Sequence, residues 1–244
     1  MPIVTTRSVV LQTHPYSDTS KILRLLTLDH GPLSVMARGA LRPRSRLSGV
    51  LEPFADGSAT FYFKPDRDLH TLSDFELTRE RQALGRDLQR FAAASVLCEL
   101  VLRLAPAERD PELYELLTRG LDALLDAPVS RVSGTALAAS WSLVEVLGFA
   151  PDLSGCSRCG DVLTEREGRL DVREGSLVCG RCLPGGGVLP PDELAKLRQL
   201  AAGNPEGLPP SGQQVRLLVD FIRHHAAEGI RLRSLDFLLA EEVR

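Results

Sequence analysis

The spacing of apolar residues changes at about Thr78 and separates a strand-like first third of the chain from a helix-like remainder. Before Thr78, short runs of β-branched, aromatic and aliphatic residues are separated by turn residues, which is typical of strands. The five runs span residues 8–13, 21–28, 31–38, 59–64 and 69–77. A closed barrel leaves such strands no free edge, and the five-stranded OB type is the natural candidate. The sequence therefore predicts an OB-type β-barrel over residues 1–80.

Beyond Thr78, leucines and other apolar residues recur three and four positions apart, which is the period of an amphipathic helix. The pattern predicts helices at about 88–104, 113–125, 135–149, 192–202, 213–228 and 232–241. Pro106, Pro111 and Pro151 fit helix boundaries, because proline lacks the amide donor that a helix needs. We interpret the leucine stripes as the core of an all-α domain formed by residues 81–150 and 186–244, with residues 151–185 as an insertion. The predicted fold class is a multidomain α+β protein.

The insertion carries two Cys-x-x-Cys motifs. They are Cys156-Ser-Arg-Cys159 and Cys179-Gly-Arg-Cys182. Two such turns supply the four sulfur ligands of a tetrahedral structural zinc ion, so we expect one Zn²⁺ at this site. A pair of disulfides is the alternative, and it would require an oxidising compartment. Four thiolates leave no open position for water or substrate, which disfavours a zinc hydrolase.

Gly160 and Gly180 directly follow two of these cysteines. A cysteine knuckle often needs positive φ at such a position, and glycine adopts it freely. We therefore expect both glycines in the left-handed region.

The composition is that of a globular chain, because 43% of its 244 residues are apolar and can form buried cores. The N-terminus has no charged segment leading into a long apolar run, and no stretch approaches the roughly eighteen apolar residues of a membrane span. These features predict a cytoplasmic protein with no membrane segment. Cys98, the fifth cysteine, falls on an apolar helix face, where a buried and inert thiol is expected.

The net charge of −3 hides an asymmetry. Residues 1–64 hold eight Lys and Arg against four Asp and Glu, a balance of +4, which leaves −7 for the remainder. A basic first third on an acidic body points to a polyanionic partner for the first third.

The clearest binding feature is a run of four arginines that alternate with small residues after the third predicted strand. They are Arg38, Arg42, Arg44 and Arg46. Gly39, Pro43 and Gly49 deny this segment regular structure, so we expect a basic loop at the rim of the barrel. The planar guanidinium can hold phosphate oxygens with two hydrogen bonds. An ordinary solvated loop is the alternative.

Aromatic residues accompany these cations in the predicted barrel. Strand alternation places Tyr62 on the opposite face from Phe61 and Phe63. Tyr62, or Tyr16 in a turn, could therefore stack on an unpaired base. For Phe61 and Phe63, a place in the barrel core competes with such a role.

No catalytic motif is found. The five histidines form no His-Glu-x-x-His motif, and no Gly-x-Ser-x-Gly or phosphate-binding loop occurs. Between Cys156 and Cys182, five arginines are balanced by five acidic residues. A module that reads nucleic acid is normally basic, so we interpret the insertion as a structural or protein-contacting element. A further hypothesis is that the C-terminal cluster contacts nucleic acid or an acidic protein segment; its residues are Arg223, His224, His225, Arg231 and Arg233.

The sequence resembles the bacterial RecO family of recombination mediators. The likeness lies in residues 9–23, 31–42, 47–54, 147–153 and 232–238. It includes Gly31-Pro-Leu-Ser and Ala37-Arg38-Gly-Ala. The resemblance implies an OB-type barrel, a helical domain with a zinc insertion, and no enzymatic activity. It also implies binding of single- and double-stranded DNA, annealing of complementary strands, and loading of a recombinase onto strands coated by single-strand binding protein, together with the RecR protein.

The sequence therefore predicts a non-enzymatic, nucleoid-associated DNA-binding protein without a small-molecule substrate. Its expected DNA contacts are Lys21, Arg24, Arg38, Arg42, Arg44, Arg46 and Tyr62, of which Lys21, Arg38 and Arg42 match basic positions of the family pattern and Arg24, Arg44 and Arg46 are added from charge. Two alternatives remain. One is a zinc-stapled adaptor that binds proteins through its helical body, the basic loop being incidental. The other is a nuclease.

Overall fold

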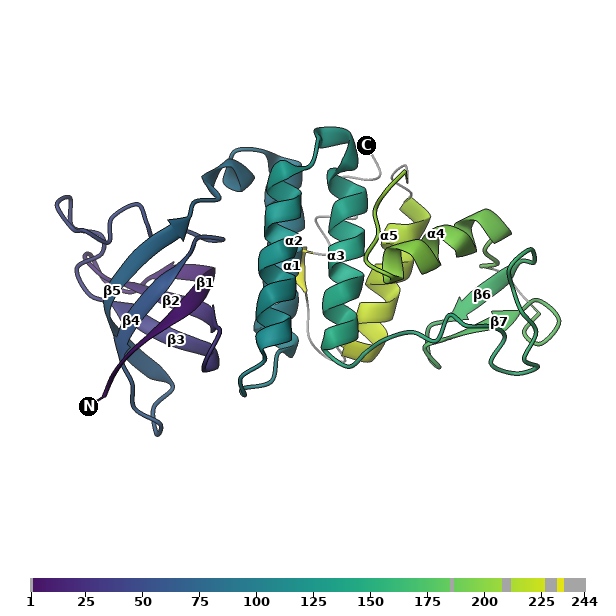
Figure 1. Cartoon of the computed structure of the whole chain (residues 1–244), viewed down its shortest axis with the longest axis horizontal. Coiled ribbons are helices and arrows are strands. Elements are labelled where there is room, and N and C mark those ends of the chain that lie inside the picture. Colours follow the sequence, from purple (N-terminus) through teal and green to yellow (C-terminus); the bar gives the residue numbers. More distant parts are fainter. Residues whose placement is uncertain (1, 185–186, 208–211, 227–231, 235–244) are drawn as a thin grey trace. The chain divides into compact units, whose positions relative to one another are not determined.

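The computed structural model describes residues 2–184, 187–207, 212–226 and 232–234, and of Ala226 only the backbone. Five strands in the first eighty residues form a closed barrel (Figure 1). They are β1 (Ile3–Pro15), β2 (Lys21–Thr27), β3 (Gly31–Ala37), β4 (Asp56–Tyr62) and β5 (Leu69–Arg79). The sheet order is β1-β2-β3-β5-β4, and β4 returns to pair with β1. This order is that of the OB type, which confirms the predicted fold class.

The longest strand closes the barrel. The first half of β1 pairs with β4 from Ile3↔Tyr62 to Val9↔Asp56, and its second half pairs with β2 from Ser8↔Thr27 to Pro15↔Lys21. All pairings are antiparallel except that of β3 with β5. Sequence analysis placed the start of this strand at Ser8, five residues late. The segment from Ile3 to Arg7 lacks a continuous apolar run and is a strand because β4 lies beside it.

Alternate residues of the strands point into the barrel. Val10, Leu23, Leu25, Val35 and Phe61 are all fully buried there. Phe61 therefore belongs to the barrel core, and Phe63 packs against it while it is partly exposed. This is the outcome that competed with base stacking in the prediction.

The turn between β2 and β3 requires glycine. Gly31 has φ +66°, and a Cβ at this position would lie 2.4 Å from the backbone oxygen of Glu108. The glycine thus allows the barrel to contact the connection between the two helices that follow.

Those helices are α1 (Leu88–Leu104) and α2 (Pro111–Asp126), which follow the short 3₁₀ turn η1 (Gln82–Gly85). The Asp87 side chain accepts a hydrogen bond from the backbone N–H of Arg90, an N-cap that starts α1. With the barrel they form one compact unit, Met1–Asp126.

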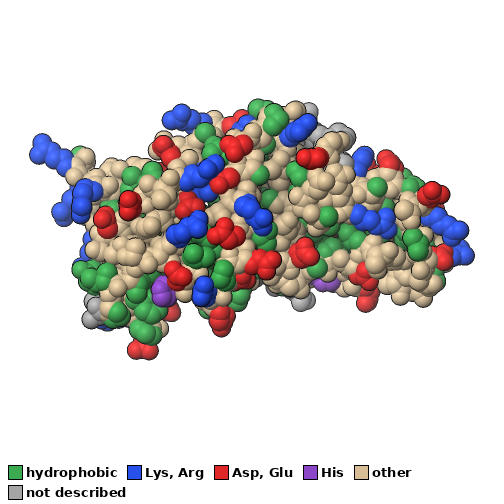
Figure 2. Space-filling view, in the orientation of Figure 1, with side chains coloured by type: hydrophobic (Ala, Val, Ile, Leu, Met, Phe, Trp, Pro, Cys, Tyr) green, Lys and Arg blue, Asp and Glu red, His purple; other side chains and the backbone are tan. Residues whose placement is uncertain are grey.

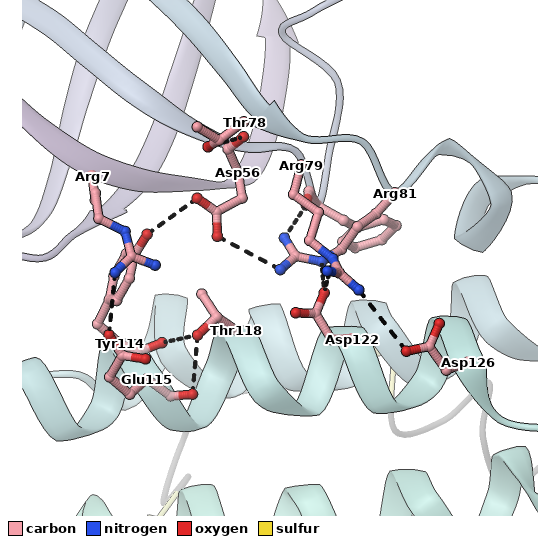
Figure 3. Close-up of polar contacts among 11 residues, drawn as sticks. Arg7, Asp56, Thr78, Arg79, Arg81, Tyr114, Glu115, Thr118, Asp122 and Asp126 are labelled. Carbon is pink, nitrogen blue, oxygen red and sulfur yellow. Dashed lines mark hydrogen bonds and ion pairs between the residues drawn. The ribbon is translucent and has the colours of Figure 1, made fainter.

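A buried polar network joins the barrel to α2 within this unit (Figure 3). The guanidinium of Arg81 lies 3.6 Å from Asp56 of β4 and 2.7 Å from Asp122 of α2. It also donates a hydrogen bond to the backbone oxygen of Phe54. The hydroxyl of Tyr114 donates to Asp56 over 3.3 Å. Burial, followed by the adjacent Asp56 carboxylate, raises the pKa of Tyr114.

The second compact unit is Ala127–Arg244. Its helices are η2 (Val129–Arg131), α3 (Val132–Val146), α4 (Pro191–Ala201) and α5 (Gly212–Phe221), and α5 continues as the π-helical turn η3 (Ile222–Ala226). Trp141 of α3 packs on Phe221 with ring centroids 5.2 Å apart. The expected helix 232–241 lies mostly outside the described residues.

Between α3 and α4 the chain forms a hairpin of β6 (Gly168–Asp171) and β7 (Ser176–Cys179). Sequence analysis did not predict these short strands. Leu163, Leu170 and Leu177 are buried here, so the insertion contributes apolar side chains to the interior of its unit.

The domain boundaries 1–80, 81–150 with 186–244, and 151–185 stay a prediction. The division into compact units falls instead after Asp126, because α1 and α2 pack with the barrel. Among the described residues, no helix is long and apolar enough to cross a membrane.

Candidate nucleic-acid interface and metal centre

The four arginines of the basic segment lie on the connection between β3 and β4, residues 38–55. Each of their side chains is exposed. Among the described residues, none of the four forms an ion pair. Figure 2 shows Lys and Arg side chains projecting from the left edge of the barrel. The sequence-based expectation of an irregular basic loop matches this geometry.

The segment is held against the barrel although it has no regular structure. The backbone N–H of Leu41 donates to the Thr19 oxygen over 3.0 Å, and Gly39 and Gly49 have φ +70° and +80°. Ala40 and Leu51 are buried in the barrel core. The arginines therefore sit on an anchored base with their charges toward solvent.

The other two expected cations lie on β2 and differ from each other. The ammonium of Lys21 lies 2.9 Å from the Glu52 carboxylate, and only 15% of the Lys21 side chain is exposed. Any phosphate at Lys21 would compete with that carboxylate. Arg24 is exposed on the outer face of the barrel, opposite Ser34 of β3 in the sheet register.

A pocket of about 320 Å³ on the barrel brings Arg38 and Tyr62 together. It is lined by Arg38, Tyr62, Lys64, Arg67, Leu69, His70 and Thr71. Lys64 and Arg67 were not among the predicted DNA contacts, because no local pattern in the sequence marks them. The pocket forms where the end of β3 meets the connection between β4 and β5, which is distant from β3 in the sequence.

Tyr62 lies on the outer face of the barrel, as strand alternation predicted. Its neighbours Phe61 and Leu72 are buried, whereas Tyr62 and Thr71, which are partners in the β4–β5 register, are partly exposed. Tyr16 is 61% exposed in the connection between β1 and β2.

His70 lines the pocket and is itself buried. Its Nδ1 accepts a hydrogen bond from the backbone N–H of Lys64 over 3.4 Å, and its ring stacks on Phe63 with centroids 5.0 Å apart. Burial, together with nearby His30, lowers the pKa of His70.

The four cysteines of the insertion converge on one point. Their sulfur atoms all lie within 4.8 Å of one another. The Sγ atoms of Cys159 and Cys179 are 3.7 Å apart. Ligands at about 2.3 Å in a tetrahedron lie about 3.75 Å from one another, so the cluster fits a tetrahedral metal ion.

Local backbone geometry prepares these thiols as ligands. The N–H of Cys179 donates to Sγ of Cys156 over 3.3 Å, and this bond is the largest cause that lowers the pKa of Cys156 to about 6. Hydrogen bonds with Cys159 and Cys179 raise the pKa of Cys182 to about 12. A bound metal ion would take the place of the protons that the thiols share. The hydrogen bonds that raise the pKa of Cys182 would then be absent. Gly160 has φ +73° as expected, but Gly180 does not have positive φ.

Most arginines of the insertion form ion pairs or hydrogen bonds with other residues of the insertion. Asp161 pairs with both Arg166 and Arg181, and Arg158 donates to the backbone oxygen of Cys182. In Figure 2, basic and acidic side chains are mixed over this part of the chain. The face seen in this view thus carries no patch of a single charge.

Two side chains of the helices hold the insertion within its unit. Arg198 of α4 donates to the backbone oxygens of Leu153 and Leu163, at 3.0 and 3.2 Å. The imidazole of His225 contacts the backbone oxygen of Val172. His225 of the C-terminal cluster therefore has a structural contact, while Arg231 of that cluster lies outside the described residues.

Comparison with known proteins gives a family. The N-terminal model of recombination protein O matches residues 1–81, and its C-terminal model matches residues 85–235. The chain is 35% identical to a DNA repair protein RecO of Anaeromyxobacter sp. (strain K) over 94% of this chain and 93% of that protein. The DNA repair protein RecO of Bacillus pumilus (strain SAFR-032) is 28% identical over 97% and 93%. The barrel, the helices and the four-cysteine cluster thus occur in a chain that belongs to the RecO family of DNA repair proteins.

Proposed function

We propose that this RecO-family chain is a non-enzymatic DNA-binding mediator that holds the phosphates of single- and double-stranded DNA on its barrel. The observation that carries the proposal is the row of four exposed arginines without ion pairs on the anchored segment between β3 and β4. Arg24 and the cations of the pocket extend this surface along the barrel. Phosphate contacts fix position but read no sequence, so binding is independent of sequence.

Binding through the phosphates suits the annealing of complementary strands. Contacts with phosphates leave the base edges free to pair, and salt-sensitive contacts release the product readily. Loading of a recombinase onto strands coated by single-strand binding protein, with RecR as a partner, is part of the proposal and rests on membership of the family. A cytoplasmic location at the nucleoid is also part of the proposal and rests on the same family membership.

The insertion has a different role in this proposal. Its four thiolates bind one structural Zn²⁺, the ion that prefers a closed tetrahedral thiolate shell. The binding energy of such an ion is folding energy. Because four of its five arginines are paired with Asp161 or with backbone oxygens, the insertion stabilises the second unit and does not read DNA.

Fluorescence anisotropy with labelled single strands and duplexes over a salt series tests the function. Affinity for both forms that falls steeply with salt supports it. Absence of DNA binding by the folded protein would favour the protein-binding adaptor. Shortened DNA after incubation with Mg²⁺ would instead reveal a nuclease.

A further inference from the structure

We propose that the pocket lined by Arg38 and Tyr62 receives one unpaired nucleotide, with its base against the tyrosine ring and its phosphate at the cationic rim. The inference rests on the proposed function and goes further, because it gives the barrel a means to distinguish single strands from duplexes.

The lining of the pocket matches the two halves of a nucleotide. Arg38, Lys64 and Arg67 supply positive charge, and no acidic residue lines the pocket. Among the described residues, none of these three cations forms an ion pair. Tyr62 and Leu69 supply apolar surface, and the volume of about 320 Å³ is that of a small-molecule site.

The sheet register places the apolar part of the pocket on an open face. Met36, Thr71 and Tyr62 lie side by side on β3, β5 and β4, and each is partly exposed. In the neighbouring row, Ser34 lies between Arg24 and Leu69. A base laid on Tyr62 thus meets further apolar surface, with an arginine beyond it.

Only an unpaired base can use this surface. In a duplex the base faces are stacked on one another, whereas a single strand can turn a base onto an aromatic side chain. A duplex can therefore reach the cations of the barrel but not the tyrosine ring.

Continuity of charge favours a nucleic acid over an acidic peptide. Arg38 belongs both to the pocket and to the segment that carries Arg42, Arg44 and Arg46. A strand with one nucleotide in the pocket can place its following phosphates along that segment. An isolated carboxylate would use only the rim of the pocket.

The test compares Tyr62→Ala and Tyr62→Phe with the wild type, using the full chain. Anisotropy is measured with a labelled oligothymidylate and with a blunt duplex of the same length. We expect Tyr62→Ala to weaken single-strand binding about 5- to 100-fold, the range for loss of one base–aromatic stack, and to leave duplex affinity within about twofold. Tyr62→Phe keeps the ring and should keep both affinities.

A second measurement locates the contact. An oligothymidylate with one 5-iododeoxyuridine joins photochemically to an aromatic ring stacked on it. We expect the product on Tyr62, within the tryptic peptide 47–67, because Pro65 blocks cleavage after Lys64.

The outcomes separate this inference from the proposed function. Equal losses for both DNA forms, or no loss, would overturn the nucleotide pocket while DNA binding stands. Failure of the wild type to bind either form would remove the function itself. If Tyr62→Ala impaired binding of an acidic peptide but not of the oligothymidylate, the pocket would belong to a protein partner.

Discussion

The guanidinium of Arg81 lies 3.6 Å from the carboxylate of Asp56, and both side chains are almost completely buried. Asp56 is the first residue of β4, and Arg81 lies just after β5. The same guanidinium reaches Asp122 of α2 and the backbone oxygen of Phe54, which has φ +73°. The Arg81 guanidinium therefore pairs with the buried Asp56 carboxylate and with Asp122 of α2. It also donates a hydrogen bond to the backbone at a residue with positive φ.

Arg81→Ala is expected to destabilise the protein by about 3–5 kcal/mol, because it removes the cation that faces the buried Asp56 carboxylate. Arg79→Ala is the matched control. Arg79 pairs with the same Asp122, but 47% of its side chain is exposed, so its loss should cost about 0–1 kcal/mol. Urea unfolding measures both free energies. Equal effects of the two variants would contradict the role given to the buried pair.

The triple variant Arg38→Ala, Arg42→Ala, Arg44→Ala should weaken DNA binding and flatten its salt dependence. Each phosphate contact on a single strand contributes about 0.7 to the slope of log K against log salt, so the slope should change by about 2. Anisotropy over a salt series measures it. The control replaces Arg103, Arg109 and Arg119, exposed arginines of α1, the following connection and α2, by alanine. A similar change in the control would show that net charge, and not the segment, is responsible.

Replacement of Cys179 and Cys182 by serine, or removal of the metal by a chelator, should lower the melting temperature of the second unit before it affects DNA affinity. The reason is that an ion held by the four thiolates would close the insertion, which is distant in sequence from the arginine segment. Metal content, thermal unfolding and anisotropy are measured on the same samples. A selective loss of DNA affinity in a folded protein would show that the insertion contacts DNA.

Thiol titration should divide the five cysteines into two classes. Cys98 is 2% exposed, and burial raises its pKa to about 12, so its thiol should not react in the native protein. The four cysteines of the cluster should react once a chelator is present. A thiol-specific chromogenic reagent counts them, and Cys98 should react only in denaturant. A fifth fast-reacting thiol in the native protein would show that α1 opens.

His70 should make the stability of the barrel sensitive to acid. The folded pKa of His70 is lowered below its ordinary value of 6.5, so the unfolded chain binds more protons as the pH falls below 6.5, and stability is lost until the folded pKa is reached. His70→Asn retains an acceptor for the Lys64 N–H but does not titrate. Urea unfolding at several pH values should show a smaller acid-dependent loss in His70→Asn than in the wild type. His14→Asn, at an exposed position, is the control substitution.

The sequence by itself determined what depends on neighbours along the chain. Alternation placed Tyr62 on the opposite face of the strand from Phe61, since successive strand residues point to opposite faces. The spacing of Cys156 with Cys159 and of Cys179 with Cys182 identified the thiol cluster, because each pair lies on one turn. The arginine segment was found from local composition, and its exposure agrees with that interpretation.

Only the tertiary structure decided which distant residues meet. The pocket requires the ends of β3, β4 and β5 to come together, and the parallel pairing of β3 with β5 follows from barrel closure, not from any local pattern. Lys21 was expected to contact DNA and Arg81 stood out in no pattern, yet Lys21 is paired with Glu52 and Arg81 is buried against Asp56. The physical reason is that charge and burial of a side chain depend on contacts across the fold, which the periodicity of a single segment does not contain.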